Sequence, residues 1–330
     1  MQNKPTCHST DTTIFLQMHF LKHIRKSETI LGKEKNMYRQ LSSYSITIIG
    51  GDQRQTLLYD SLKQQGYQVS GIALEPSPYI DMDPSCFSST KLQASDLWIT
   101  GIPFSKDGIH LFSKAAPKAI SIQSFLFFLQ QAPPKLLIGG QFPKEVVAFA
   151  RTYQIPCHDL LKRQSMAIAN AIPTAEGAIF HAMKESVYTI DHAACLVLGF
   201  GKCGKALAQR LQGLHGKVTV CTRSEEDLAY AASCGYQTLP FSHLQKQLPS
   251  FLFIFNTIPA PVMGPKRLAL CHASCVIIDI ASQPGGVDFS YAAQHKLTAK
   301  LCPGLPGKMA PKSAALILEE QILRLFSFQN

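Results

Sequence analysis

Three glycines at a strand-to-helix turn form the pattern with the clearest chemistry. Gly199, Gly201 and Gly204 follow the apolar run Ala194–Leu198 and open a helix-prone segment. In this context the first glycine permits a tight turn, the second lets the backbone approach a diphosphate, and the third allows the helix to pack closely on the strand. The amides and the dipole at the helix start attract phosphates. The sequence therefore predicts a dinucleotide site made of Gly199, Phe200, Gly201, Lys202, Cys203 and Gly204.

The end of the next predicted strand, Lys217–Cys221, indicates which dinucleotide binds. NAD-binding proteins place an Asp or Glu there, which accepts a hydrogen bond from the ribose 2′-OH. Thr222, Arg223 and Ser224 occupy that position here, and a guanidinium with two hydroxyls suits a 2′-phosphate. We therefore expect NADP. The alternative is that Arg223 is an exposed turn residue and that NAD binds.

Two later loops are expected to face the cofactor and the substrate. They follow the predicted strands Phe251–Asn256 and Val276–Ile280, and ligands of open α/β sheets lie outside the carboxyl ends of the strands. For Asp279 we expect a role in tying its loop together rather than in catalysis. The predicted cofactor contacts are Asn256, Thr257, Ile258, Pro259 and Ala281, and Ser282 is a predicted substrate contact.

The length and the pattern of the sequence predict that two parallel sheets form the framework for these loops. At about 150 residues per domain, 330 residues predict two domains. Short apolar runs alternate with helix-prone stretches throughout, which is typical of parallel sheets. The predicted strands are Ser45–Ile49, Tyr67–Leu74, Leu97–Ile102, Lys135–Ile138 and Ile155–Cys157, then Ala194–Leu198, Lys217–Cys221, Phe251–Asn256, Val276–Ile280 and Leu297–Cys302. We predict an α/β fold with two Rossmann-like, doubly wound parallel-sheet domains and an interdomain cleft.

The predicted boundaries divide the chain into five parts. They are an N-terminal extension (1–44), a flavodoxin-like or Rossmann-like substrate domain (45–165), a connecting helix (166–187), an NADP-binding domain (188–307) and a C-terminal helix that packs back on the first domain (308–330). The extension is either weakly structured or lies upstream of a true start at Met37. The connecting helix is expected to begin at Thr174, because Pro173 discourages helix before it.

The composition excludes several other classes of protein. The net charge is +10, but the basic residues form no block and do not alternate with aromatic residues, so anionic small molecules are expected rather than nucleic acid. Every apolar run is shorter than the roughly 20 residues that cross a bilayer. The 11 histidines and 10 cysteines lack metal-ligand spacing, so we expect no metal and free, buried thiols in a reducing cytosol.

Five segments, taken together, resemble the family of dipicolinate synthase A subunits. They are Gly50–Gln55, Ala171–Gly177, Gly199–Gly204, Ile278–Gly286 and Pro303–Lys312, and the resemblance covers Ser45 to the C-terminus. It implies an NADP-dependent oxidoreductase that forms dipicolinate from dihydrodipicolinate together with a flavoprotein-like B subunit of the same synthase. It further implies the cytoplasm of the mother cell of a sporulating bacterium. We also expect an oligomer, although no residue argues for it.

The dicarboxylate that the resemblance implies needs basic groups to bind it. Arg54, Gln55 and Lys312 are the candidates, because guanidinium and ammonium groups bind carboxylates strongly. Asp52 is a candidate base, and its alternative roles are to hold Arg54 in place or to cap the helix Gln53–Gln65. Arg54 is alternatively a plain surface charge.

Glu176 is the candidate for proton transfer, with Thr174 beside it. The alternative is that both residues favour the start of the connecting helix by capping and by charge. Two other functions stay open.

The protein is alternatively an NADP-dependent reductase of another keto or imino acid, or an NADP-binding regulatory protein without chemistry of its own.

Overall fold

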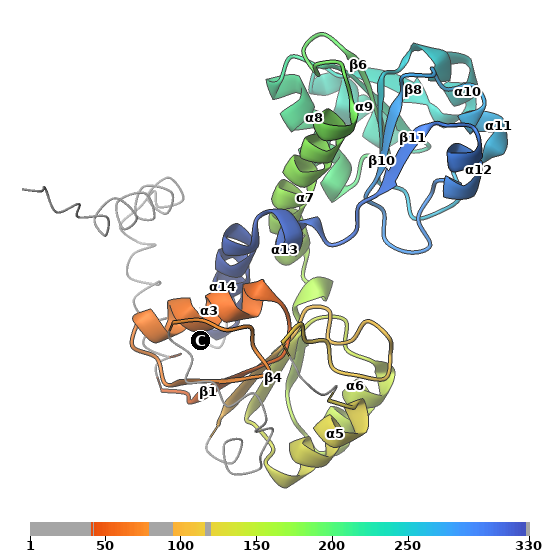
Figure 1. Cartoon of the computed structure of the whole chain (residues 1–330). Helices are drawn as coiled ribbons and strands as arrows, with labels where there is room; N and C mark the ends of the chain where they lie inside the picture. The colour runs from red at the N-terminus through yellow and green to blue at the C-terminus, as the bar shows by residue number, and fades with distance from the viewer. Residues whose placement is uncertain (1–40, 42, 79–94, 116–119, 328–330) are drawn as a thin grey trace, which may run out of the picture.

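The computed structural model describes residues 41, 43–78, 95–115 and 120–327. Figure 1 shows two lobes, with helix α7 (Gln164–Glu185) running between them. The predictions for residues 1–40, including a start at Met37, lie outside the described residues.

A five-stranded parallel sheet forms the first lobe, in the order β2-β1-β3-β4-β5. Its strands are β1 (Ile46–Ile49), β2 (Val69–Ile72), β3 (Leu97–Thr100), β4 (Leu136–Gly139) and β5 (Cys157–Asp159). Strands β1, β3 and β4 are buried along their whole length, as in sheets that helices cover on both faces. One face packs on α3 (Gln53–Gln64) and α14 (Pro311–Ser327), and the other packs on α5 (Ile122–Gln131) and α6 (Lys144–Thr152).

A six-stranded parallel sheet forms the second lobe, in the order β11-β10-β9-β6-β7-β8. Its strands are β6 (Ala194–Leu198), β7 (Lys217–Thr222), β8 (Gln237–Pro240), β9 (Phe253–Asn256), β10 (Val276–Asp279) and β11 (Thr298–Leu301). Its helices include α8 (Lys202–Gly213), α9 (Glu225–Ser233), α10 (Leu244–Gln247), α11 (Pro265–Leu268), α12 (Phe289–Gln294) and α13 (Leu305–Met309). This strand order is that of dinucleotide-binding sheets, so the predicted doubly wound α/β fold is confirmed.

Strand β8 was missing from the prediction, which gave this sheet five strands. Its four residues lie at the sheet edge beside β7, and only Leu239 among them is buried. An edge strand that buries one side chain leaves no apolar run in the sequence. The prediction of five strands for the second sheet was therefore wrong by one.

The predicted start of the connecting helix at Thr174 was also wrong. Helix α7 begins at Gln164 and contains Pro173. Proline removes one backbone donor and normally disrupts a helix interior, but Pro173 is buried within this helix. The Thr174 hydroxyl donates to the carbonyl oxygen of Asn170, 2.7 Å away, which is a common use of threonine inside a helix. Thr174 is therefore a mid-helix residue and not a cap.

The C-terminal helix α14 completes the first lobe rather than the second. It packs against α3, and Figure 1 shows the blue end of the chain beside the orange helix. Leu318 and Ile322 are each 1% exposed within the core of this lobe. Tyr44 lies edge-on to Phe326, with ring centroids 5.3 Å apart, and Leu41 is fully buried. The packed part of the chain thus begins before residue 45.

The described residues allow two sequence expectations to be examined, one on membrane-spanning helices and one on the cysteines. No described helix combines the length and the apolarity that a membrane crossing requires. The described cysteines are free, and four of them are buried, namely Cys195, Cys221, Cys275 and Cys302.

Shortening Leu318 should destabilise the first lobe. Leu318→Ala removes a fully buried side chain from the contact between α14 and the sheet, which costs about 2–5 kcal/mol in the free energy of unfolding. Ser313→Ala, at an exposed position of the same helix, should change it little. Urea unfolding of both variants measures the difference, and equal midpoints would contradict the packing role of α14.

Candidate functional site

Each sheet has one point at which the strand order reverses. This point lies between β1 and β3 in the first sheet and between β6 and β9 in the second. Open α/β sheets bind ligands outside the carboxyl ends of the strands at such points. The loops that follow these four strands therefore contain the candidate site.

The glycine loop after β6 has the geometry of a phosphate cradle. Gly199 has a left-handed backbone with φ of +89°, which glycine adopts without strain. A Cβ at Gly204 would lie 2.2 Å from the carbonyl oxygen of Gly199, whereas a Cβ at Gly201 would meet nothing within 4 Å. Gly201 is the N-cap of α8 and makes no side-chain cap. The loop therefore leaves open space beside helix amides, which fits a dinucleotide diphosphate.

The loop after β9 lies against this glycine loop. The Thr257 hydroxyl donates to the carbonyl oxygen of Leu198 at 2.8 Å, and a Cβ at Gly199 would lie 2.6 Å from that hydroxyl and 2.9 Å from Ile258. Pro259 is exposed at the end of the loop. Phe200 is 2% exposed and packs in the core. Its backbone, rather than its ring, lies in the loop.

Asp279, at the end of β10, ties the neighbouring loops together. Its Oδ1 accepts from Asn256 Nδ2 and from the Ala281 amide, each at 2.9 Å, and its Oδ2 accepts from the Gly286 amide at 2.8 Å. Both Asp279 and Asn256 are fully buried. These bonds confirm that Asp279 ties its loop, and they leave Ser282 exposed at the loop tip.

Two arginines from different elements lie against the ring of Phe241: Arg223 in the turn after β7, and Arg267 on helix α11. The Arg223 guanidinium lies 4.9 Å from the ring centroid of Phe241, and the Arg267 guanidinium lies 4.8 Å from it. The Ser224 hydroxyl accepts from the Asp227 amide at 3.1 Å and so caps α9, while Thr222 is 7% exposed. Arg267 was not predicted. It stands 44 residues after Arg223 in the sequence, and no local motif links the two.

Asp52 and Arg54 form a two-bond ion pair after β1. Arg54 Nε lies 2.8 Å from Asp52 Oδ1, and Nη2 lies 3.0 Å from Oδ2. The same guanidinium donates to the carbonyl oxygen of Ile102, after β3. Burial raises the pKa of Asp52, but the hydrogen bonds and charge of Arg54 outweigh this and hold that pKa below its usual range. Asp52 thus stays ionised at neutral pH.

Asp52 also caps helix α3. Its Oδ1 accepts from the Arg54 amide at 3.1 Å, and the Asp52 amide donates to Gln55 Oε1 at 3.0 Å. This reciprocal arrangement is a capping box. Both alternative roles weighed for Asp52, holding Arg54 and capping the helix, are confirmed. Gln55 is fully buried and serves the cap.

Three lysines, Lys106, Lys114 and Lys308, interact electrostatically with this ion pair or with one another. Lys114 donates its amide to the carbonyl oxygen of Gly51 at 2.9 Å, and the Lys106 ammonium lies 3.5 Å from the ring centroid of Phe112. Burial lowers the pKa of Lys106, Asp52 opposes this, and the charges of Lys114, Lys308 and Arg54 lower the pKa further. The lysines therefore share one electrostatic neighbourhood with Arg54.

Helix α13 brings Lys308 to this neighbourhood from the end of the second sheet. A Cβ at Gly307 would lie 2.7 Å from Arg54 Nε and 3.1 Å from Asp52 Oδ2. Lys308 follows directly in the sequence, whereas the predicted Lys312 is exposed in the first turn of α14. Lys106, Lys114 and Lys308 were not predicted, because only the tertiary fold brings these three segments together.

Glu176 and Thr174 lie away from these groups. Glu176 Oε1 accepts from Arg210 Nε at 3.1 Å, and its side chain is 60% exposed. Arg210 belongs to the last turn of α8, whereas the glycine loop lies at the first turn. Neither residue is a helix cap, because α7 begins ten residues before Thr174.

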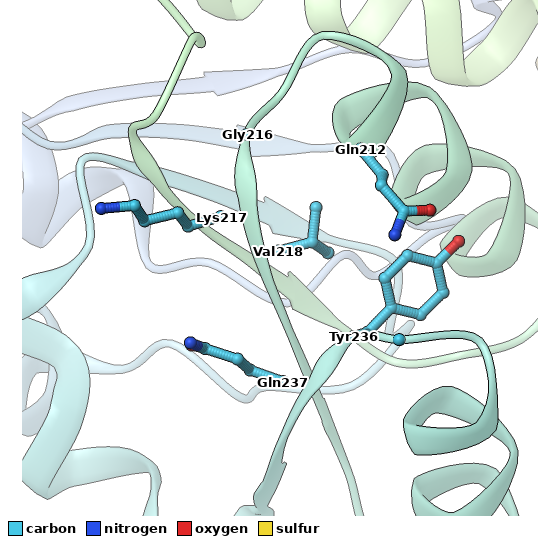
Figure 2. Close-up of a pocket in the computed structure, with 7 residues that line it drawn as sticks. Gln212, Gly216, Lys217, Val218, Tyr236 and Gln237 are labelled. Carbon is cyan, nitrogen blue, oxygen red and sulfur yellow. The ribbon is translucent and has the colours of Figure 1, made fainter.

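A small pocket of about 170 Å³ lies at the amino ends of strands β7 and β8 in the second sheet (Figure 2). The first residues of β7 and β8, namely Lys217, Val218 and Gln237, line the pocket together with Gln212, Gly216, Gly235 and Tyr236. Ligand sites usually enclose about 300–1,000 Å³. The pocket is smaller than that and lies at the amino ends of the strands, so it is not the dinucleotide site. In the described part of the chain, no cluster of three or more His, Cys, Asp or Glu is suited to a metal ion.

Two comparisons with known proteins find similarity to the same kind of protein. Residues 45–161 match the family model that describes the N-terminal domain of the dipicolinate synthase A subunit. The A subunit of dipicolinate synthase from Bacillus subtilis (strain 168) is 28% identical over 301 residues, which cover 87% of this chain and 97% of that protein.

Solved structures agree with this result. The crystal structure of the dipicolinate synthase A subunit from Bacillus halodurans matches with a TM-score of 0.74 and 28% identity, over 87% of this chain and 98% of that chain. D-lactate dehydrogenase with NAD⁺ from Lactobacillus jensenii shares the fold, with a TM-score of 0.52 and 12% identity over 84% of this chain and 94% of that one. The resemblance indicated by the five sequence segments is confirmed.

Adding a methyl group at Gly204 should abolish tight dinucleotide binding. Gly204→Ala forces the helix away from the carbonyl of Gly199 and displaces the loop, and we expect binding to weaken at least tenfold, or by about 1.4 kcal/mol. Gly213→Ala, at the other end of α8, meets nothing within 4 Å and should leave binding unchanged. Fluorescence titration with NADPH measures both variants, and equal affinities would contradict the assigned loop.

Proposed function

We propose that this chain is a dipicolinate synthase A subunit, which oxidises dihydrodipicolinate to dipicolinate with NADP in a complex with the B subunit. The observation that carries the proposal is the cluster of cationic side chains around Asp52. Arg54, Lys106, Lys114 and Lys308 give this cluster a net charge of about +3 at neutral pH. Such a charge suits a small ligand with two carboxylates.

The cationic cluster binds and orients the dicarboxylate in this proposal. Nε and Nη2 of Arg54 are engaged by Asp52 and by the Ile102 carbonyl, so these partners fix the guanidinium and leave its Nη1 donors for a carboxylate. Lys106, Lys114 and Lys308 supply flexible ammonium groups for the remaining carboxylate oxygens. We propose Lys308 in place of Lys312 for this role. Gln55 supports the helix start rather than the substrate.

The second sheet holds the cofactor in this proposal. The glycine loop binds the diphosphate, and the loops from Asn256 to Pro259 and around Ala281 line the carboxyl edge. Arg223 and Arg267 suit the 2′-phosphate, because both guanidiniums lie within 5 Å of the Phe241 ring centroid and guanidinium groups bind phosphates strongly. When bound, NADP accepts the hydride that leaves the substrate ring.

Loss of a hydride and a proton makes the substrate ring an aromatic pyridine. The aromatic stability of the product therefore makes the oxidation thermodynamically favourable. The chain then needs mainly to hold the ring and the cofactor in register. We leave Glu176 and Thr174 out of the reacting groups, because one pairs with Arg210 and the other with its own helix. Asp52 positions Arg54, and its lowered pKa makes it a weak base.

Formation of dipicolinate tests the proposal directly. The condensation product made by dihydrodipicolinate synthase is mixed with this protein, NADP and the B subunit, and absorbance in the dipicolinate band is followed. We expect product only when all components are present. Tight NADP binding without product would overturn the proposal. It would favour a keto-acid or imino-acid reductase, or an NADP-binding regulatory protein.

Removing one lysine of the cluster should weaken substrate binding selectively. Lys106→Ala or Lys308→Ala removes a charged hydrogen bond worth about 1.5–3 kcal/mol, which predicts a KM for substrate about 10–100-fold higher. The affinity for NADP should not change. Lys135→Ala is the control, because its side chain is 72% exposed and pairs with Asp96 at the surface. Steady-state kinetics of the complex distinguish the variants, and an unchanged KM would remove the cluster from the substrate site.

Replacing either arginine beside Phe241 should change the choice of cofactor. Arg223→Ala is expected to weaken NADP binding about 10–100-fold, for the same loss of a charged hydrogen bond, and to leave NAD binding nearly unchanged. Arg267→Ala should act in the same direction. Calorimetric titration with both dinucleotides gives the ratio of the affinities for NADP and NAD. Arg151→Ala, on α6, is the control and should leave this ratio unchanged. A parallel loss of NADP and NAD binding would show that the arginines support the fold instead.

A further inference from the structure

Helix α7 exposes an apolar stripe. Ile168, Ile172, Phe180 and Met183 are 58%, 43%, 49% and 52% exposed, respectively. Of the 14 large apolar residues that are exposed in the described chain, seven lie on α7, in the two residues Val187 and Tyr188 after it, or at Leu214 beside it. An exposed apolar surface of this kind commonly marks an interaction site.

The stripe is a distinct face of the helix. At about 100° per residue, Ile168, Ile172, Glu176, Phe180 and Met183 fall within an arc of about 120°. Two other faces of α7 are already occupied. Ala175, Ala178 and Ala182 pack in the core of the second sheet with α8, and Gly177 packs on Leu305 and Met309 of α13. The face turned to solvent in a surface helix is normally polar, and here it is apolar around one carboxylate.

A groove runs along the C-terminal half of this stripe, between α7 and α8. It encloses about 650 Å³ and is lined by apolar side chains that include Phe180, Met183 and Leu214. Its two charged lining residues, Glu176 and Arg210, pair with each other at 3.1 Å. The groove therefore carries no net charge, although the whole chain carries +10.

We propose that a second copy of this chain docks on the α7 stripe, with the two α7 helices antiparallel about a twofold axis near Glu176. The stripe has apolar residues on both sides of Glu176, at four and eight positions before it and at four and seven positions after it. It therefore presents a similar apolar pattern in both directions. Antiparallel pairing brings Phe180 of each copy opposite Ile172 of the other.

Two identical copies complement each other in this arrangement. Each copy supplies Phe180 and Met183 from one half of the stripe and Ile172 and Ile168 from the other, so that each half meets the opposite half of its partner, as a twofold interface requires. Two chains of like charge repel, and the neutral stripe is a place where they meet without added repulsion. From Ile168 to Met183 the stripe is about 22 Å long, which is long enough for a standard interface of about 800 Å² on each side.

The mass of the full-length protein in solution tests this proposal. Sedimentation velocity at micromolar concentration should give a dimer for the unaltered chain, and Phe180→Glu should halve the mass. Phe127→Glu is the matched control, because Phe127 is 57% exposed on α5 and should leave the dimer intact. Circular dichroism and NADPH titration of each variant establish that it is folded. A monomeric unaltered chain, or a folded Phe180→Glu variant that stays dimeric, would overturn the proposal.

Charge complementation tests the antiparallel pairing. Ile172→Lys and Phe180→Glu should each give monomers alone and should form a mixed dimer when combined, because the new charges then face each other across the axis. Failure of the mixture to dimerise would overturn the antiparallel arrangement. A chain that is monomeric alone but binds the B subunit of the synthase through Phe180 would also overturn the proposal and assign the stripe to that heteromeric contact.

Discussion

Small side chains on helix α7 are the constraint on which the arrangement of this molecule depends. Ala175, Ala178 and Ala182 are fully buried, and Gly177 lies against α13, where a Cβ would be 3.0 Å from Met309 and 3.2 Å from Leu305. Larger side chains would push α8 and α13 outwards, since packed cores accommodate added volume poorly. The short distance between α7 and α13 in turn sets Gly307 against Arg54. A helix that makes no direct contact with the proposed substrate thus determines where Lys308 lies.

The two sheets build their loop clusters by the same means. In each sheet a buried carboxylate near the strand-order reversal accepts several hydrogen bonds, Asp52 beside β1 and Asp279 at the end of β10. Loops at the carboxyl ends of strands have few neighbours that fix their conformation. A carboxylate that accepts several hydrogen bonds fixes it instead. The difference lies in the remaining partners. Asp279 is satisfied by amides, whereas Asp52 engages a guanidinium that still has donors to offer.

The local parts of this structure could be read from the sequence. The glycine loop, the turn at Arg223 and the helix predicted at Gln53–Gln65 lie where the pattern predicts them, because each depends on residues that are close in the chain. Arg267 and Lys308 could not be found in this way, since only the completed fold sets each beside its cluster. Glu176 illustrates a third case. The sequence places it on a helix correctly, but the direction of its side chain depends on which faces of α7 are already occupied.

The position of α14 has a consequence for how the polypeptide is made. The core of the first lobe includes Leu318, Ile322 and Phe326, which leave the ribosome after the entire second sheet. Domains generally fold as units during synthesis, in the order in which they emerge. Here the lobe whose strands emerge first lacks part of its core until the last residues arrive, whereas the strands and glycine loop of the second lobe form one continuous stretch. The second lobe is therefore the first unit whose residues are all present, and the helix that closes the other lobe comes last.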